Sequence, residues 1–119
     1  MVTALLVLVC GAAGAIARFV VDGAIESRRL GEFPWGTLIV NLGGTFVLGL
    51  LVGLTAPQRT MEVLGTAAIG SYTTFSTWML ETHRPAEAGE TRLAWVNLAV
   101  GLASGLAAIA LGRALGRLL

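Results

Sequence analysis

A dense cluster of hydroxyl groups lies inside one of the most apolar stretches of the sequence. The segment GSYTTFSTW, residues 70–78, carries six hydroxyl side chains within an uncharged run from Val63 to Leu80. Because successive residues of an α-helix are turned by about 100°, these hydroxyls would cover every face of a continuous helix. Isolated Ser and Thr side chains return their hydroxyls to the carbonyl one turn back. Six together instead predict a break near Gly70 and Ser71 that turns backbone groups toward a polar site.

Two other apolar segments carry polar side chains that match this cluster. Thr37, Asn41 and Thr45 recur at a spacing of four and form one stripe on a helix, and Asn97 and Ser104 lie in the last apolar segment. Buried amides and hydroxyls in an apolar surrounding either join helices or line the path of a polar ligand. We expect Asn41 to line such a path, and Asn97 and Ser104, taken singly, to join helices.

The residue types around the cluster limit its possible ligand. The central part of each apolar segment has no Asp, Glu, Lys or His, which argues against proton coupling through a buried carboxylate. Arg18 is the one charged residue deep in an apolar segment, and Asp22 lies one turn further along the chain. The position of Arg18 is equally compatible with an anchor at the membrane interface and with a direct role in the site. The edges of Phe75 and Trp78 suit an anion, whereas hydroxyls and carbonyls also suit Na⁺. The residues alone predict a site for a small hard ion.

The elements that position these residues are predicted to be membrane-spanning helices. Of the 119 residues 55% are hydrophobic and 13% charged, and the mean hydropathy is +0.81, unlike a soluble domain. We therefore predict an all-α membrane protein of one domain, residues 1–119. Since about 20 apolar residues cross a bilayer, the uncharged runs predict four transmembrane helices, the third broken near mid-membrane, at residues 2–21, 35–56, 61–80 and 93–113.

The distribution of arginines bears on the orientation of these helices. All eight basic residues are arginines. With four crossings, three arginines fall on the side of the N-terminus and four on the other: Arg59, Arg113 and Arg117 against Arg28, Arg29, Arg84 and Arg92. An orientation is fixed by a clear excess of positive charge on one side, which is absent here. We expect a dual-topology chain whose opposed copies pair across a two-fold axis; the alternative is that a weaker signal, such as Arg28 with Arg29, sets one orientation.

Small residues at helical spacing predict close helix packing. GxxxG pairs occur at Gly49 with Gly53, at residues 101 and 105, and at Gly112 with Gly116. Such pairs let the backbones of two membrane helices approach closely. They predict a tightly packed bundle and carry no information about function.

Three motifs together resemble one family. GAAGAIARF (residues 11–19), GTLIVNLGGTFVLGLLVG (36–53) and GSYTTFSTWMLE (70–81) are similar to the successive signatures of the small fluoride channels of the Fluc type, also called CrcB proteins. The resemblance covers essentially the whole chain, including its length and four apolar segments. It implies an antiparallel homodimer with two fluoride pathways and a structural Na⁺ at the dimer centre.

The resemblance also implies roles for individual residues. Backbone carbonyls of Gly70 and Thr73 would hold the Na⁺, and Arg18 takes the place of the family's arginine in the first helix. The fluoride pathway is assigned to residues that match the motifs or continue their polar stripe: Asn41, Phe75, Trp78, Thr74, Ser76, Thr77, Thr37 and Asn97. Two positions depart from the family pattern. Trp78 stands where the family usually has Phe, and Ser71 follows Gly70 where a second glycine is common.

The predicted function is passive export of cytoplasmic fluoride through a channel in the cell membrane. The expected partners are fluoride, a second antiparallel copy and the lipid bilayer, with no nucleic acid and no enzymatic activity. One alternative is a small multidrug-type proton-coupled exporter, which depends on a glutamate in its first helix, whereas residues 1–21 contain no acid. Another is a non-transporting membrane assembly subunit, in which the polar residues would only join helices.

Overall fold

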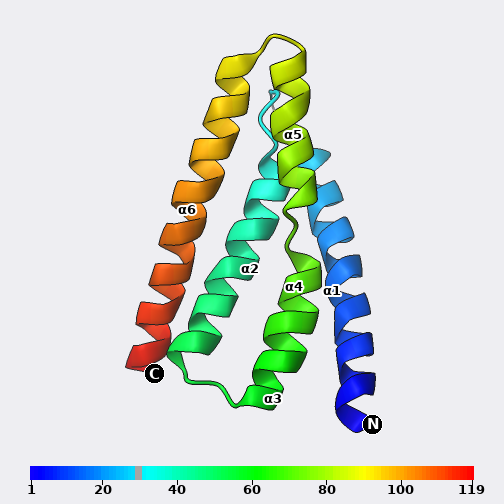
Figure 1. Ribbon diagram of the computed structural model, residues 1–119, viewed down its shortest axis with the longest axis vertical. Coiled ribbons are helices and arrows are strands. Elements are labelled where there is room, and N and C mark those ends of the chain that lie inside the picture. The colour runs from blue at the N-terminus through cyan, green and yellow to red at the C-terminus, as the bar shows by residue number, and fades with distance from the viewer. Residues whose placement is uncertain (29–30) are drawn as a thin grey trace.

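The computed structural model describes residues 1–28 and 31–119, which are mainly helical and contain no strand. Arg29, one of the arginines in the charge comparison, lies outside the described residues. The elements are, in chain order, α1 (Val2–Glu26), α2 (Trp35–Gly53), α3 (Gln58–Thr60), the π-helical segment η1 (Met61–Ile69), α4 (Gly70–Tyr72), α5 (Ser76–Glu87) and α6 (Thr91–Leu118) (Figure 1). The predicted all-α class is confirmed.

Three of the helices in the described part of the chain, α1, α2 and α6, have the length and apolar composition needed to cross a membrane. The predicted span at 61–80 has a different form. It comprises η1, α4 and the first part of α5, with Thr73–Phe75 between the last two outside any helix. The predicted position of the break is wrong, because Gly70 and Ser71 are both helical and the backbone becomes extended only at Thr73 (ψ 159°). The hydroxyl of Ser71 bonds the Ala67 carbonyl of η1, one turn back, as a serine inside a helical stretch does.

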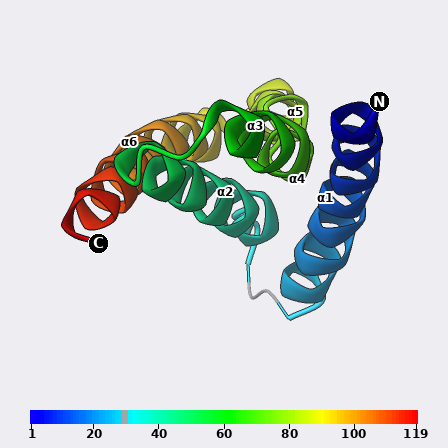
Figure 2. The same cartoon turned by 90° about the horizontal axis from the view of Figure 1, so that it is seen from below.

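The closest helix pairing is between α2 and α6, which lie side by side in both ribbon views (Figures 1 and 2). Two of the GxxxG pairs meet at this crossing. A Cβ placed on Gly49 would collide with the Ile109 carbonyl, and one on Gly112 would collide with the Phe46 carbonyl. Gly53 and Gly116 repeat this arrangement one turn further on. The two backbones are in direct contact, which only glycine permits at these positions.

The first helix stands to one side of the other helices (Figure 2) and contacts η1 and α4 through small residues. A Cβ on Gly14 would collide with the Ala68 carbonyl and the Ser71 hydroxyl. The Ser71 hydroxyl lies 2.8 Å from the carbonyl oxygen of Gly11 and also bonds the Ala67 carbonyl one turn back. Part of the hydroxyl cluster therefore fixes α1 against the segment that precedes the interruption.

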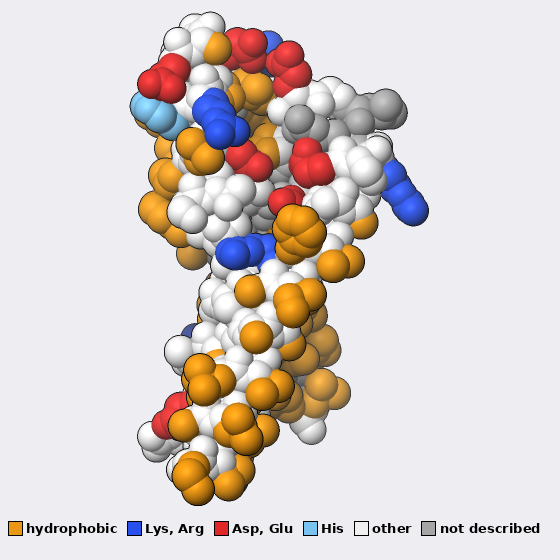
Figure 3. All heavy atoms as spheres, turned by 90° about the vertical axis from the view of Figure 1, so that its right-hand side faces the viewer, with side chains coloured by type: hydrophobic (Ala, Val, Ile, Leu, Met, Phe, Trp, Pro, Cys, Tyr) orange, Lys and Arg blue, Asp and Glu red, His pale blue; other side chains and the backbone are white. Residues whose placement is uncertain are grey.

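Both termini lie at one end of the molecule, and the α5–α6 turn lies at the other (Figure 1). This turn is made at Gly89, whose positive φ of 84° suits glycine, and the Glu90 N–H returns to the Pro85 carbonyl at 2.8 Å. Charged side chains gather toward the end with the turn, whereas apolar side chains cover most of the other half (Figure 3). The described residues bury few apolar side chains, namely Val40, Val63 and Ala94. Most of the apolar surface faces outward, as in a protein surrounded by lipid.

Candidate functional site

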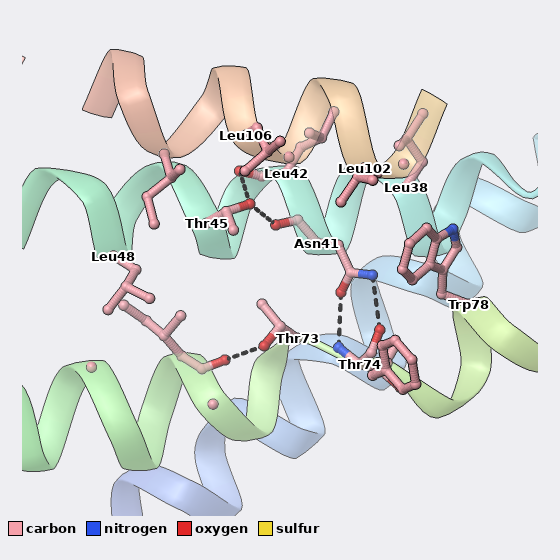
Figure 4. A pocket seen from close by; sticks show the side chains of 17 residues that line it. Leu38, Asn41, Leu42, Thr45, Leu48, Thr73, Thr74, Trp78, Leu102 and Leu106 are labelled. Atoms are coloured by element: carbon pink, nitrogen blue, oxygen red, sulfur yellow. Dashed lines mark hydrogen bonds between the residues drawn. The ribbon is translucent and has the colours of Figure 1, made fainter. Parts of the chain in front are cut away.

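The interruption between α4 and α5 is held by the side chain of Asn41 on α2 (Figure 4). The Asn41 Nδ2 donates to the Thr74 carbonyl at 2.9 Å, and the Thr74 N–H donates to Asn41 Oδ1 at 2.8 Å. The amide thus satisfies both backbone groups of one residue, as a neighbouring β-strand would. Because unsatisfied backbone groups are costly in an apolar surrounding, this pair stabilises a non-helical segment between two helices.

The same pair changes the surroundings of the carbonyls predicted to hold Na⁺. In a continuous α-helix the Thr74 N–H would bond the Gly70 carbonyl, but here it is directed at Asn41. The Thr73 carbonyl accepts a hydrogen bond from Arg18 Nη1 at 3.2 Å. A carbonyl oxygen has two lone pairs and so keeps one for a second partner. Hard carbonyl oxygens at an interruption suit an alkali cation, so Gly70 and Thr73 fit the predicted ligand type.

The hydroxyls of the cluster divide into separate roles. Those of Ser71 and Thr73 bond carbonyls one turn back, Thr73 to Ile69 at 3.0 Å. The Thr74 hydroxyl accepts the backbone N–H of Thr77 at 3.2 Å and lies 3.1 Å from the Thr77 hydroxyl. By accepting the N–H three residues on, the Thr74 hydroxyl satisfies a backbone donor in the first turn of α5, which begins at Ser76. Ser76 is exposed.

We call the stretch from η1 to α5, which contains the interruption at Thr73–Phe75, the interrupted segment. A largely apolar cavity of about 410 Å³ lies between α2, the interrupted segment and α6 (Figure 4). Its wall includes Asn41, Gly70, Thr73, Thr74, Phe75 and Trp78. The rings of Phe75 and Trp78 meet edge to face, with centroids 5.8 Å apart and planes at 77°. Phe75 is 69% exposed, because the helices of one chain leave this side of the cavity open.

A second cavity of about 220 Å³ is lined mainly by polar groups of α1, α2 and the interrupted segment. Arg18, Asp22, Thr37, Thr74 and Thr77 contribute to its wall. Thr37 is only 2% exposed, and among the described residues neither its hydroxyl nor the Oδ1 of Asp22 has a hydrogen-bond partner. Buried polar atoms normally have partners, so these two atoms indicate that the cavity takes water or a polar ligand. Asp22 forms no ion pair with Arg18 within the described chain; the guanidinium bonds the Thr73 carbonyl instead.

Thr74 lines both cavities. Its backbone is held by Asn41 and its hydroxyl by Thr77. The residue at the interruption therefore separates a polar compartment on the α1 side from an apolar, aromatic compartment on the α6 side. An ion that passed between them would meet backbone groups, hydroxyls and ring edges in succession.

Most of the site residues predicted from the sequence meet at these cavities. They are Arg18, Thr37, Asn41, Gly70, Thr73, Thr74, Phe75, Thr77 and Trp78. Ser76 and Asn97 line neither cavity, and their role in a pathway stays a prediction. Asn97 is 2% exposed, donates to Thr82 Oγ1 at 2.8 Å, and accepts the indole N–H of Trp78 on its backbone carbonyl at 3.2 Å.

Sequence reasoning missed three residues that the structure places at or beside the cavities. Asp22 was considered only as a partner of Arg18, although it forms part of the polar wall. Thr82 and Gly101 were not assigned to the site, yet both contact the Trp78–Asn97 pair. The spacing of four between Asn97 and Gly101 places them on one helix face, which was the available signal.

Comparison with known proteins identifies the family. Residues 5–113 match the family described as CrcB-like protein, Camphor Resistance (CrcB). The chain belongs to this family. A protein of Mycolicibacterium paratuberculosis named "Fluoride-specific ion channel FluC 2" is 46% identical over 112 residues, which cover 94% of this chain and 92% of that protein. "Fluoride-specific ion channel FluC 1" of Symbiobacterium thermophilum is 47% identical over 118 residues, 93% of this chain and 94% of its own.

A third relative of this CrcB-like chain, "Fluoride-specific ion channel FluC 2" of Mycobacterium bovis, is 44% identical over 107 residues, covering 90% and 85% of the two chains. All three are named as ion channels, and none as an exporter, an assembly subunit or an enzyme. Together with its apolar helices of membrane length, this membership identifies a multi-pass membrane protein. The family predicted from the sequence is confirmed.

The pair between Asn41 and Thr74 generates a prediction about stability. Asn41→Ala removes a donor and an acceptor and leaves two backbone groups of Thr74 without partners. We expect the folded state to lose about 1–3 kcal/mol, measured as a lower midpoint of thermal unfolding in detergent. Thr45→Ala is the control on the same stripe, because its hydroxyl bonds carbonyls of its own helix. Equal losses in the two variants would show that Asn41 does not hold the interruption.

Proposed function

We propose that this protein is a fluoride channel of the cell membrane, which lets cytoplasmic fluoride leave passively. The observation that carries the proposal is the position of Thr74, which lines both the polar cavity and the aromatic one. The relatives named as fluoride-specific ion channels supply the identity of the ion. The ion would have entered the cell as neutral HF from acidic surroundings and ionised in the cytoplasm.

The proposed mechanism is replacement of the water around fluoride by protein donors in series. The guanidinium of Arg18 and the hydroxyls of Thr37 and Thr77 lie on the polar side. On the aromatic side, positively polarised ring edges of Phe75 and Trp78 meet the ion. Conduction requires binding that is strong enough to admit the ion and weak enough to release it, and several weak donors satisfy that requirement better than one strong one. In this scheme the segment from η1 to α5 makes a third, interrupted crossing of the membrane.

We further propose that a second, antiparallel copy covers the open side of the aromatic cavity. Phe75 is exposed there although its ring lies beside Trp78. The chain exposes 7531 Å², compared with about 6,100 Å² for a compact soluble monomer of this mass. The balanced arginines favour insertion in both orientations, and each half of such a dimer would have its own pathway.

A Na⁺ bound by the Gly70 and Thr73 carbonyls of both copies would belong to this dimer. The Thr73 carbonyl lies at the interruption, and the Gly70 carbonyl lies one turn before it, where the Thr74 N–H is directed to Asn41 instead. The cation would supply a fixed positive potential near the pathway without a mobile basic side chain. The Arg18 guanidinium, which is also positively charged, donates a hydrogen bond to the same carbonyl of Thr73.

Fluoride efflux from liposomes tests the function. Purified protein should release fluoride, read with a fluoride electrode, and retain chloride in matched liposomes. Phe75→Ala should slow fluoride release about fivefold, since an aromatic contact contributes about 1 kcal/mol. Trp95→Ala is the control, because Trp95 is also 69% exposed but lies outside both cavities. A folded dimer that releases no fluoride would refute the function, and equal rates for the two variants would refute the role of Phe75.

Removal of Na⁺ tests the cation. Protein purified and reconstituted with N-methyl-D-glucamine in place of Na⁺ should unfold at a lower temperature and release fluoride more slowly, and added Na⁺ should restore both properties. Stability rises because a ligand that binds only the folded state shifts the unfolding equilibrium. Potassium at the same concentration controls for ionic strength. Identical unfolding in all three salts would exclude a structural Na⁺.

Labelling of single cysteines tests the dual topology. In a Cys10→Ala background, Ala88→Cys and Gln58→Cys place a thiol at opposite ends of the molecule, and both sites are exposed. A membrane-impermeant maleimide should label about half of each variant in sealed vesicles when the chain inserts both ways. Labelling after permeabilisation gives the total. Full labelling of one variant and none of the other would establish a single orientation.

A further inference from the structure

The indole of Trp78 is held against α6 by two neighbouring backbone features. Its Nε1–H donates to the Asn97 carbonyl at 3.2 Å. Beside that bond lies Gly101, where an added Cβ would come within 2.6 Å of Nε1 and within 2.9 Å of Cζ2. Residues 97 and 101 are one turn apart on the same helix face, so the carbonyl and the glycine form one site for the ring edge. We call this site, Asn97 with Gly101, the indole notch.

The backbone of Trp78 is tied to the same residue of α6. The Asn97 side-chain amide donates to Thr82 Oγ1 at 2.8 Å, and that hydroxyl donates to the Trp78 carbonyl at 2.9 Å. Asn97 is 2% exposed, so these bonds are shielded from exchange with solvent. Asn97 therefore fixes the side chain of Trp78 directly and its main chain through Thr82. These bonds fix α5 to α6 through both the side chain and the backbone carbonyl of Trp78.

This arrangement limits what the indole can offer to an ion. An indole has a single N–H donor, and in Trp78 that donor is bonded to α6. Trp78 lines the aromatic cavity beside Phe75. Trp78 could donate its N–H to an anion only by leaving the indole notch. The indole fits closely there, against Gly101.

We propose that the indole notch holds Trp78 in one orientation, and that Gly101 and Asn97 are the positioning residues of the aromatic pair. Trp78 then acts through its ring and not as a hydrogen-bond donor to the ion. Gly101 is the residue that permits the larger indole, because any side chain at this position would displace it. This inference rests on the proposed function, in which Phe75 and Trp78 border the fluoride path.

A double-mutant cycle tests the proposal. Fluoride efflux is compared for wild type, Gly101→Ala, Trp78→Phe and the double variant. Gly101→Ala should slow efflux on the order of tenfold in the wild-type background and by much less in the Trp78→Phe background, since a phenyl ring does not extend into the indole notch. Gly23→Ala is the matched control, because nothing lies within 4 Å of its added Cβ. An equal effect of Gly101→Ala in both backgrounds would overturn the proposal.

Fluorescence gives a second readout that does not depend on transport. In a Trp35→Phe, Trp95→Phe background, Trp78 is the remaining tryptophan. Gly101→Ala should increase quenching of its emission by acrylamide, whereas Gly23→Ala should not. Unchanged quenching would show that Gly101 does not position the indole. If wild-type liposomes release no fluoride, the proposed function fails, while this fluorescence measurement still decides the orientation of Trp78.

The folding yield of the variants is itself informative. If Gly101→Ala alone fails to give folded protein and the Trp78→Phe double variant folds, the rescue supports a clash with the indole. If both fail, the clash is not with the indole and the proposal is overturned. Protein expression, fluoride efflux and fluorescence thus all test the contact between Gly101 and the Trp78 indole.

Discussion

The pair of hydrogen bonds between Asn41 and the backbone of Thr74 is the interaction on which the site depends. An apolar surrounding provides no water for free N–H and C=O groups, so a membrane segment can leave the helical conformation only where protein groups replace the missing bonds. Asn41 replaces two of them at once. With that support the backbone extends at Thr73 and α5 starts at Ser76, so that Phe75 lies just before the helix and Trp78 lies in its first turn.

The polar residues of this chain serve two purposes that sequence composition does not distinguish. Ser71 joins α1 to the segment before the interruption, and Asn97 joins α5 to α6. Thr37, by contrast, directs a buried hydroxyl without a described partner into the polar cavity. Hydrogen bonds between membrane helices are of moderate strength. The structure needs several of them because it contains few buried apolar side chains.

Glycine determines how closely the parts of the site approach one another. At the α2–α6 crossing, Gly49 and Gly112 bring two backbones into contact and thereby set the position of Asn41 relative to α6. At Gly101 the missing side chain accommodates the Trp78 indole. The same residue type thus serves backbone packing in one place and side-chain packing in another, although both occur in GxxxG pairs. The GxxxG spacing alone indicates close packing, but it does not show which backbone or side chain packs against the glycine.

The sequence by itself determined the all-helical membrane class, the family and most of the polar and aromatic residues around the two cavities. Apolar run length is fixed by bilayer thickness, and motif identity is a property of the linear chain, so both can be read without coordinates. The interruption was predicted near Gly70 and Ser71, but only the tertiary structure decided that it lies at Thr73–Phe75, because its position depends on where Asn41 from another helix meets the backbone. For the same reason the sequence could not show that Asn97 is bonded to Thr82 and Trp78, or that Gly101 receives the indole. Such contacts are set by the distance and rotation between helices, which the order of residues along one helix does not contain.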